Sequence, residues 1–159
     1  MANLANSMKD AESVLFLGRH VGFPVALEGA LKLKEIAYLH AEGFAAGELK
    51  HGPIALIEEG QPVFVIVPSP RGRDSLHSKV VSNIQEIRAR GAITIVIAEE
   101  GDTAVEDYAN HVIRIPKAPT LMQPLLATVP LQIFAAHVAK SKGYDVDQPR
   151  NLAKSVTVE

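Results

Sequence analysis

Four short apolar segments, separated by stretches with helical periodicity, constrain the fold more than any other feature of this sequence. The most continuous of them is residues 61–67, in which every position after Gln61 is apolar and which ends at Pro68. Such uninterrupted runs are typical of strands that are buried on both faces, as in a parallel sheet. Residues 13–18, 93–98 and 111–115 predict three further strands.

The segments between and around these strands have the pattern of helices. Residues 73–90 repeat apolar side chains at helical spacing and stop at Gly91. Pro24 suits the first turn of another helix, which runs to Leu39 and which residues 40–44 extend briefly. Two more helices are expected over residues 4–12 and 122–142.

Strands that alternate with helices predict an α/β fold with right-handed crossovers. We expect a three-layer α/β/α sandwich around a mostly parallel, flavodoxin-like sheet of about four to five strands. A chain of 159 residues has the length of one domain, so we expect a single domain over residues 1–159. Its C-terminal tail, from about residue 144 to 159, is expected to be irregular.

Composition excludes several kinds of site and partner. The absence of cysteine rules out disulfides, thiolate metal sites and a cysteine nucleophile. Sixteen basic residues are interspersed with eighteen acidic ones, so no basic field for nucleic acid is expected. The six histidines are scattered and no nucleotide-binding glycine motif occurs, so we predict neither a metal nor a cofactor.

Nothing in the sequence predicts a targeting or membrane segment. The first residues, MANLANSMKDAES, lack the apolar core of a signal peptide, and no apolar run reaches about 18 residues. We therefore expect a cytoplasmic protein without a membrane partner.

The helix that begins near Pro24 carries a stripe of charge on an otherwise mostly apolar surface. Glu28, Lys32 and Glu35 are spaced at i, i+4 and i+7, within an arc of about 60°. Two interpretations remain open at this point. The stripe is either a ladder of ion pairs worth roughly 0.2–0.5 kcal/mol each, or the lining of a cleft.

The loop after this helix, GELKHGP, presents an imidazole that titrates near neutrality. His51 lies between Gly47 and the Gly52-Pro53 pair, which favour a turn. It is either a solvated surface histidine or a member of the same site as the stripe.

Three strings, FLGRHVGFPVALEGALKLKEIAYLHAE, AAGELKHGP and DQPRNLAKSVTVE, together resemble the C-terminal part of the glucosamine-6-phosphate synthase family, also called glutamine-fructose-6-phosphate aminotransferase (isomerizing). The resemblance covers residues 14–159 and implies the second of two SIS (sugar isomerase) domains. Members of this family also have an N-terminal glutaminase domain and convert fructose 6-phosphate and ammonia to glucosamine 6-phosphate in the cytoplasm. The resemblance therefore implies the glutaminase and first SIS domains as partners of this third part.

The resemblance also implies roles for individual residues. Glu35 of LKLKE corresponds to the base that moves a proton between C1 and C2 of the sugar, and Lys32 and Glu28 to its neighbours in the site. His51 of ELKHGP resembles the histidine that opens the sugar ring. In the family this histidine reaches into the site of the partner subunit, which implies a homodimer.

Lys154 of RNLAKS corresponds to the lysine that forms an imine with the open-chain ketose, and Arg150 to its neighbour. An imine draws electrons from C2, so that the C1–H bond becomes acidic enough for a carboxylate to take the proton. The lysine must be neutral to attack, and a positive charge such as that of Arg150 favours the neutral form.

One loop departs from the family pattern. The first SIS domain holds the sugar phosphate in a loop of S-Q-S-G-E-T type, whereas residues 67–75 here read VPSPRGRDS. Ser69 is the only hydroxyl close to the strand end, and the prolines beside it remove backbone donors. We expect no strong phosphate site in this half alone.

These observations predict the C-terminal isomerase domain of such an enzyme, incomplete and inactive by itself. An alternative is a regulatory SIS module that binds a phosphosugar without catalysis. A third possibility is a dimerisation scaffold, in which the stripe acts only as an ion-pair ladder and His51 as a subunit contact.

Overall fold

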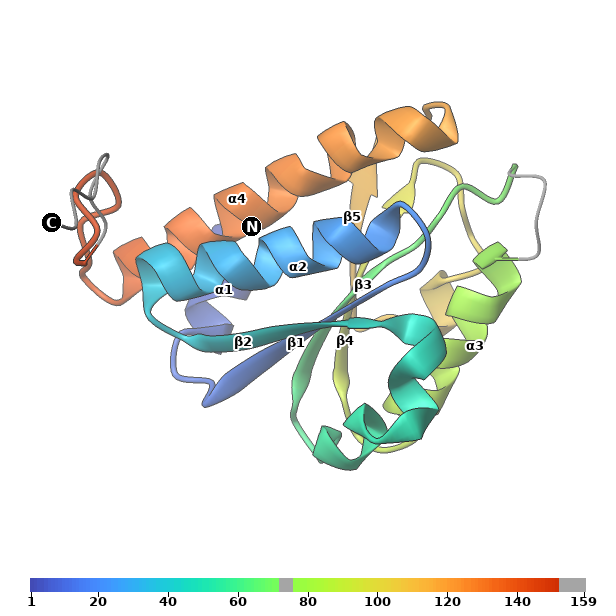
Figure 1. Cartoon of the computed structure of the whole chain (residues 1–159), viewed down its shortest axis with the longest axis horizontal. Coiled ribbons are helices and arrows are strands. Elements are labelled where there is room, and N and C mark those ends of the chain that lie inside the picture. The colour runs from blue at the N-terminus through green and yellow to red at the C-terminus, as the bar shows by residue number, and fades with distance from the viewer. Residues whose placement is uncertain (72–75, 152–159) are drawn as a thin grey trace, which may run out of the picture.

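The computed structural model describes residues 1–71 and 76–151 and is built on a five-stranded sheet (Figure 1). The sheet has the order β2-β1-β3-β4-β5, and every neighbouring pair is parallel. Its strands are β1 (Ser13–Gly18), β2 (His40–Ala45), β3 (Pro62–Ile66), β4 (Ile93–Glu99) and β5 (His111–Ile115). The predicted three-layer α/β/α architecture with four to five parallel strands is confirmed.

Helices cover both faces of the sheet (Figure 1). One face carries α1 (Ala2–Met8), α2 (Gly22–Lys32) and α4 (Gln123–Ser141), and the other carries α3 (Leu76–Arg88) with the short 3-10 turns η2 (Ala46–His51) and η3 (Pro53–Leu56). Two further 3-10 turns are η4 (Glu106–Tyr108) and η5 (Thr120–Met122). Each face has its own core because alternate residues of a strand point to opposite sides.

The core beneath α2 and α4 contains a stack of three phenylalanines. The rings of Phe16 and Phe64 are 5.0 Å apart and nearly parallel, and Phe134 of α4 tilts against Phe64 at 4.7 Å. On the other face, Leu17 and Val65 of the strands pack with residues of α3. This apolar filling fixes where the strand ends, and hence the loops, lie.

The expectation that residues 40–44 extend the preceding helix was wrong, because residues 40–45 form the edge strand β2. Among the residues that the structure describes, this strand pairs with β1 alone, and Ala41 is its one fully buried residue. An edge strand with so little buried surface lacks the continuous apolar run by which the central strands were recognised. The described part of the C-terminal tail, residues 144–151, contains turns and bends but neither helix nor strand.

The helical stretch Thr120–Ser141 is, among the described residues, long and apolar enough to cross a membrane by length and composition. Its inner side carries Leu131 and Phe134, which are buried in the core with α2 and the sheet. Core packing thus accounts for the apolar residues of its inner side. The outer side carries a row of exposed residues, which we call the α4 strip: Met122, Leu125, Val129 and Ile133.

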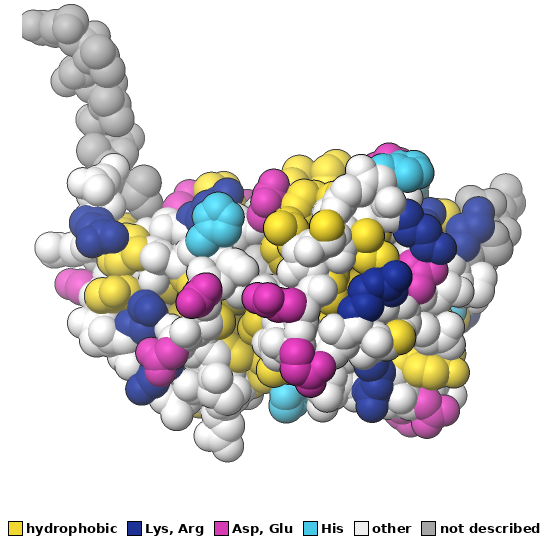
Figure 2. Space-filling view, turned by 90° about the horizontal axis from the view of Figure 1, so that it is seen from below, with side chains coloured by type: hydrophobic (Ala, Val, Ile, Leu, Met, Phe, Trp, Pro, Cys, Tyr) yellow, Lys and Arg dark blue, Asp and Glu magenta, His cyan; other side chains and the backbone are white. Residues whose placement is uncertain are grey.

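The face shown in Figure 2 has acidic and basic side chains interspersed around hydrophobic ones. A mixed surface of this kind does not generate the field of a single sign that draws nucleic acid to a protein.

Candidate active site

The helix that carries the charged stripe changes its winding where the stripe ends. Residues Leu33–Ala37 form a π-helical turn, η1, in which the Tyr38 N–H donates to the carbonyl of Leu33, five residues earlier. Tyr38 itself has left-handed backbone angles, with φ 53° and ψ 36°. Single π-turns within helices occur frequently at functional sites. Glu35 lies in the middle of this turn.

Glu28, Lys32 and Glu35 form one ion-paired chain. The Lys32 Nζ atom lies 2.5 Å from Glu35 Oε2 and 3.4 Å from Glu28 Oε1. The hydrogen bond with Glu35, together with the charge of both carboxylates, outweighs partial burial and raises the pKa of Lys32 above its ordinary value. Lys32 is therefore protonated at neutral pH. It holds one oxygen of Glu35, while the other has no hydrogen bond among the described residues.

Glu35 faces a cavity of about 520 Å³ between the end of the helix and the C-terminal tail. The cavity is also lined by Tyr38 and Arg150. The structure thus brings Glu35 and Arg150, two predicted site residues from distant parts of the sequence, to one place. Its other lining residues are Lys34, Leu39, His40 and Asn151. A carboxylate beside two cationic side chains, those of Lys34 and Arg150, and beside hydrogen-bonding groups suits a hydroxylated, anionic ligand.

The structure does not bring His51 into this cavity. His51 ends η2, beyond the C-terminal end of β2, whereas Glu35 lies before the strand begins. A strand of six residues is about 20 Å long. The His51 side chain is 72% exposed, and its Nδ1 atom lies 2.8 Å from the Glu48 carboxylate. Lys154, the predicted imine lysine, lies outside the described residues.

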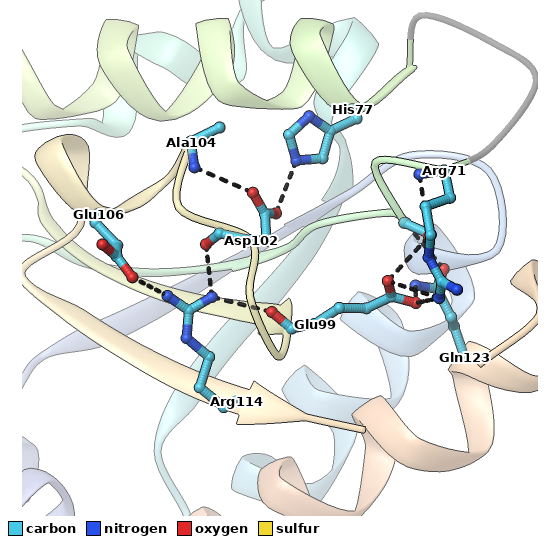
Figure 3. Close-up of polar contacts among 9 residues, drawn as sticks. Arg71, His77, Glu99, Asp102, Ala104, Glu106, Arg114 and Gln123 are labelled. Atoms are coloured by element: carbon cyan, nitrogen blue, oxygen red, sulfur yellow. Dashed lines mark hydrogen bonds and ion pairs between the residues drawn. The ribbon is translucent and has the colours of Figure 1, made fainter. Parts of the chain in front are cut away.

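A second polar cluster, at the carboxyl end of the sheet, was not predicted (Figure 3). Its centre is the Glu99 side chain, which ends β4 and is only 2% exposed. Ser69 donates its hydroxyl to Glu99 at 3.0 Å, and the Arg71 guanidinium lies 3.1 and 3.2 Å from the two carboxylate oxygens. The Gln123 amide and the Ala118 N–H complete the set at 3.1 and 3.3 Å.

These donors determine the charge state of Glu99. Burial alone would raise the pKa of its carboxyl group. The hydrogen bonds from Ala118, Ser69 and Arg71, with the charge of Arg71, outweigh burial and hold this pKa below its ordinary value. Glu99 is therefore an anion within the fold. It takes up the donors at the end of β3, where the first SIS domain of the resembled family is expected to hold a phosphate.

A neighbouring pair extends this cluster. His77 at the start of α3 lies 2.7 Å from the buried Asp102 carboxylate, and Arg114 of β5 donates to the carbonyls of Glu99 and Asp102 at 3.0 and 2.7 Å (Figure 3). These contacts connect α3 and β5 to the loop after β4.

A match along most of the chain identifies its family. The family model described as the SIS domain matches residues 7–141. The chain belongs to the SIS domain family. The SIS match includes the π-turn with Glu35 and the loop with His51, and it ends before Arg150.

Close relatives of this SIS chain are bacterial enzymes. It is 90% identical over 156 residues to glutamine–fructose-6-phosphate aminotransferase [isomerizing] of Corynebacterium diphtheriae, and 70% identical over 159 residues to that of Mycobacterium tuberculosis strain H37Rv. These alignments cover 98% and 100% of this chain but 25% and 26% of the relatives. The chain thus spans about a quarter of the length of the curated relatives it matches.

A solved structure of a related domain has the same fold. The C-terminal domain of glucosamine-fructose-6-phosphate aminotransferase from Francisella tularensis matches with a TM-score of 0.81 and 41% identity, covering 92% of this chain and 40% of that one. The resemblance to this family inferred from the sequence is confirmed.

Metal chemistry finds no support in the part of the chain that the structure describes. There, no group of three or more histidine, aspartate or glutamate side chains is placed to hold a metal ion.

The sequence contains one feature from which the position of Glu99 at the polar cluster could have been predicted. It is a carboxylate at the end of an apolar strand, and the ends of parallel strands meet at one edge of the sheet.

Proposed function

We propose that this chain is the C-terminal SIS domain of a glutamine–fructose-6-phosphate aminotransferase. In this proposal it supplies part of the site that converts fructose 6-phosphate and glutamine-derived ammonia to glucosamine 6-phosphate. The observation that carries the proposal is the Glu35 carboxylate, held by Lys32 in a π-turn and facing a cavity that Arg150 also lines. Its relatives' names supply the substrate, and a cytoplasmic location follows from the same analogy.

The proposed chemistry assigns a task to each group. Glu35 takes the proton from C1 and returns it at C2 through its free oxygen, while Lys32 keeps the carboxylate in place. Lys154 forms an imine with C2 of the open-chain ketose and releases water, and ammonia then displaces the lysine amine, so that the imine that acidifies C1–H carries the nitrogen of the product. The charge of Arg150 favours the neutral amine that the first of these steps needs. Glu28 supports Lys32. The remaining group, His51, opens the ring in the site of the other subunit of a homodimer.

The α4 strip supports the view that this domain works within a larger assembly. Met122, Leu125, Val129 and Ile133 recur at helical spacing and are exposed. A cavity of about 320 Å³ beside them is lined mainly by apolar residues, including Leu126 and Pro130. Contiguous apolar surface of this kind marks contact with another protein surface, which we propose is another domain of the full-length enzyme.

Mixing two halves tests the proposed function directly. The chain alone, with fructose 6-phosphate and ammonium, is expected to form no glucosamine 6-phosphate, because Ser69 and Arg71 are bonded to Glu99 and the phosphate-holding loop expected of the family belongs to the first SIS domain. Addition of a separately produced first SIS domain is expected to restore measurable formation. The control is the same mixture with the Glu35→Gln chain, which should form no glucosamine 6-phosphate. Robust turnover by the chain alone would contradict this assignment.

Hybrid dimers test the assignment of His51. Glu35→Gln and His51→Asn, each made in full-length enzyme, are expected to be nearly inactive as homodimers. If His51 serves the partner's site, each mixed dimer has one site with both residues intact and one with neither. Random exchange of equal amounts of the two variants should then recover about one quarter of the parent activity, as expected for a two-fold symmetric dimer. Recovery of none would place both residues in the site of one subunit.

A further inference from the structure

The C-terminal tail meets the π-turn through one aromatic side chain. The Arg150 N–H donates to the Tyr38 hydroxyl at 2.7 Å, and the Arg150 guanidinium lies 4.0 Å above the centre of the Tyr38 ring. Within residues 147–151, the end of the described chain, this is the one polar attachment to the rest of the fold. The placement of Arg150 therefore depends on Tyr38.

The position of Tyr38 depends in turn on the π-turn. Tyr38 takes up the left-handed conformation in which its N–H closes the turn on Leu33. The next N–H, from Leu39, returns to the same carbonyl at 3.4 Å. The Tyr144 ring, at 4.8 Å, supports Tyr38 from the tail side. One local irregularity thus presents the Glu35 carboxylate and directs the Tyr38 side chain toward the tail.

We propose that Tyr38 is a positioning residue that seats the C-terminal tail so that Arg150 lies at the cavity beside Glu35. The proposal rests on the proposed function, since it concerns the same site. A tyrosine supplies both contacts at once, because its ring face attracts the guanidinium and its hydroxyl oxygen accepts the backbone N–H. In sequence the seated segment leads on to Lys154, four residues after Arg150.

Three variants separate the two contacts. Tyr38→Phe keeps the ring under Arg150 and removes the acceptor, whereas Tyr38→Leu removes both. Tyr144→Phe is the matched control, since it removes a hydroxyl from the neighbouring ring and leaves both contacts with Arg150 in place.

The first measurement uses this chain and does not depend on enzyme activity. Amide hydrogen exchange at Arg150 is expected to speed up roughly fivefold in Tyr38→Phe, the factor that corresponds to one ordinary hydrogen bond, and further in Tyr38→Leu. Amides in the middle of α2 should exchange as in the parent, which shows that the fold is intact. Unchanged exchange at Arg150 in both variants would overturn the proposal, whatever the reaction proves to be.

The second measurement is kcat/KM for fructose 6-phosphate in the full-length enzyme. Tyr38→Leu is expected to lose about 100-fold, the size of effect that a misplacement of about 1 Å can have. Tyr38→Phe should retain a large part of the activity and Tyr144→Phe nearly all. Activity of Tyr38→Leu within twofold of the parent would overturn the role in positioning. If Glu35→Gln also retained its activity, the proposed function itself would fail. Retained activity in Tyr38→Leu alone would contradict only the positioning role of Tyr38.

Discussion

Glu35→Gln in the full-length enzyme is expected to lower kcat for glucosamine 6-phosphate formation by roughly 100- to 10,000-fold, the usual contribution of a general base. Glutamine has nearly the same size and keeps an oxygen that can accept the hydrogen bond from Lys32. It cannot take a proton from C1. The π-turn and the cavity should therefore remain, while the proton transfer is lost.

Two assays on the same preparation distinguish lost chemistry from lost folding. Incorporation of solvent deuterium at C2, the carbon that receives the proton, should disappear with the synthesis of product, whereas glutamine hydrolysis by the separate glutaminase domain should continue. Glu42→Gln is the matched control, because Glu42 is an exposed carboxylate on the neighbouring strand β2. It should behave like the parent enzyme. Deuterium incorporation by Glu35→Gln at more than about a tenth of the parent rate would assign the base to another residue.

The parts of this fold that the sequence predicts are those in which local pattern and tertiary packing agree. Strands β3 and β4 are buried on both faces, so their apolar runs are continuous and identify a parallel sheet. The helix periodicity of α3 is equally local. The edge strand β2 was missed because one buried alanine gives no such pattern.

The candidate site likewise has parts that local sequence spacing predicts and parts that depend on tertiary structure. Glu28, Lys32 and Glu35 are close in sequence, so helical spacing alone predicts that they share a face. The π-turn is not visible in that spacing, because it depends on how the chain leaves α2 to form β2. The approach of Arg150 to Tyr38 joins residues 112 positions apart. The Glu99 cluster needs the strand order, since it gathers side chains from the ends of β3 and β4 and from the start of α4.

Glu99→Ala is expected to lower the free energy of unfolding by about 3 kcal/mol, measured by urea denaturation of this chain. Loss of one partner of a buried ion pair costs roughly 3–5 kcal/mol, because the other groups lose their bonds without regaining water. The lower end applies here, since the Arg71 side chain is 58% exposed and stays hydrated. The Ser69 hydroxyl and the Gln123 amide are buried and bear most of the cost. Glu100→Ala, at the exposed next position, should change stability by less than about 0.5 kcal/mol.

Glu99→Ala also tests how the stabilisation by Glu99 depends on pH. The pKa of Glu99 is lower in the folded chain than its ordinary value of 4.5, so the ionised carboxylate stabilises the fold above pH 4.5. That contribution is lost as the pH falls through the folded pKa. The difference in unfolding free energy between the parent and Glu99→Ala should therefore be constant near neutrality and shrink below pH 4.5. A difference that stayed constant on acidification would show that packing of the side chain, and not its charge, holds the strand ends together, and one that grew would show that the folded pKa of Glu99 is raised instead of lowered.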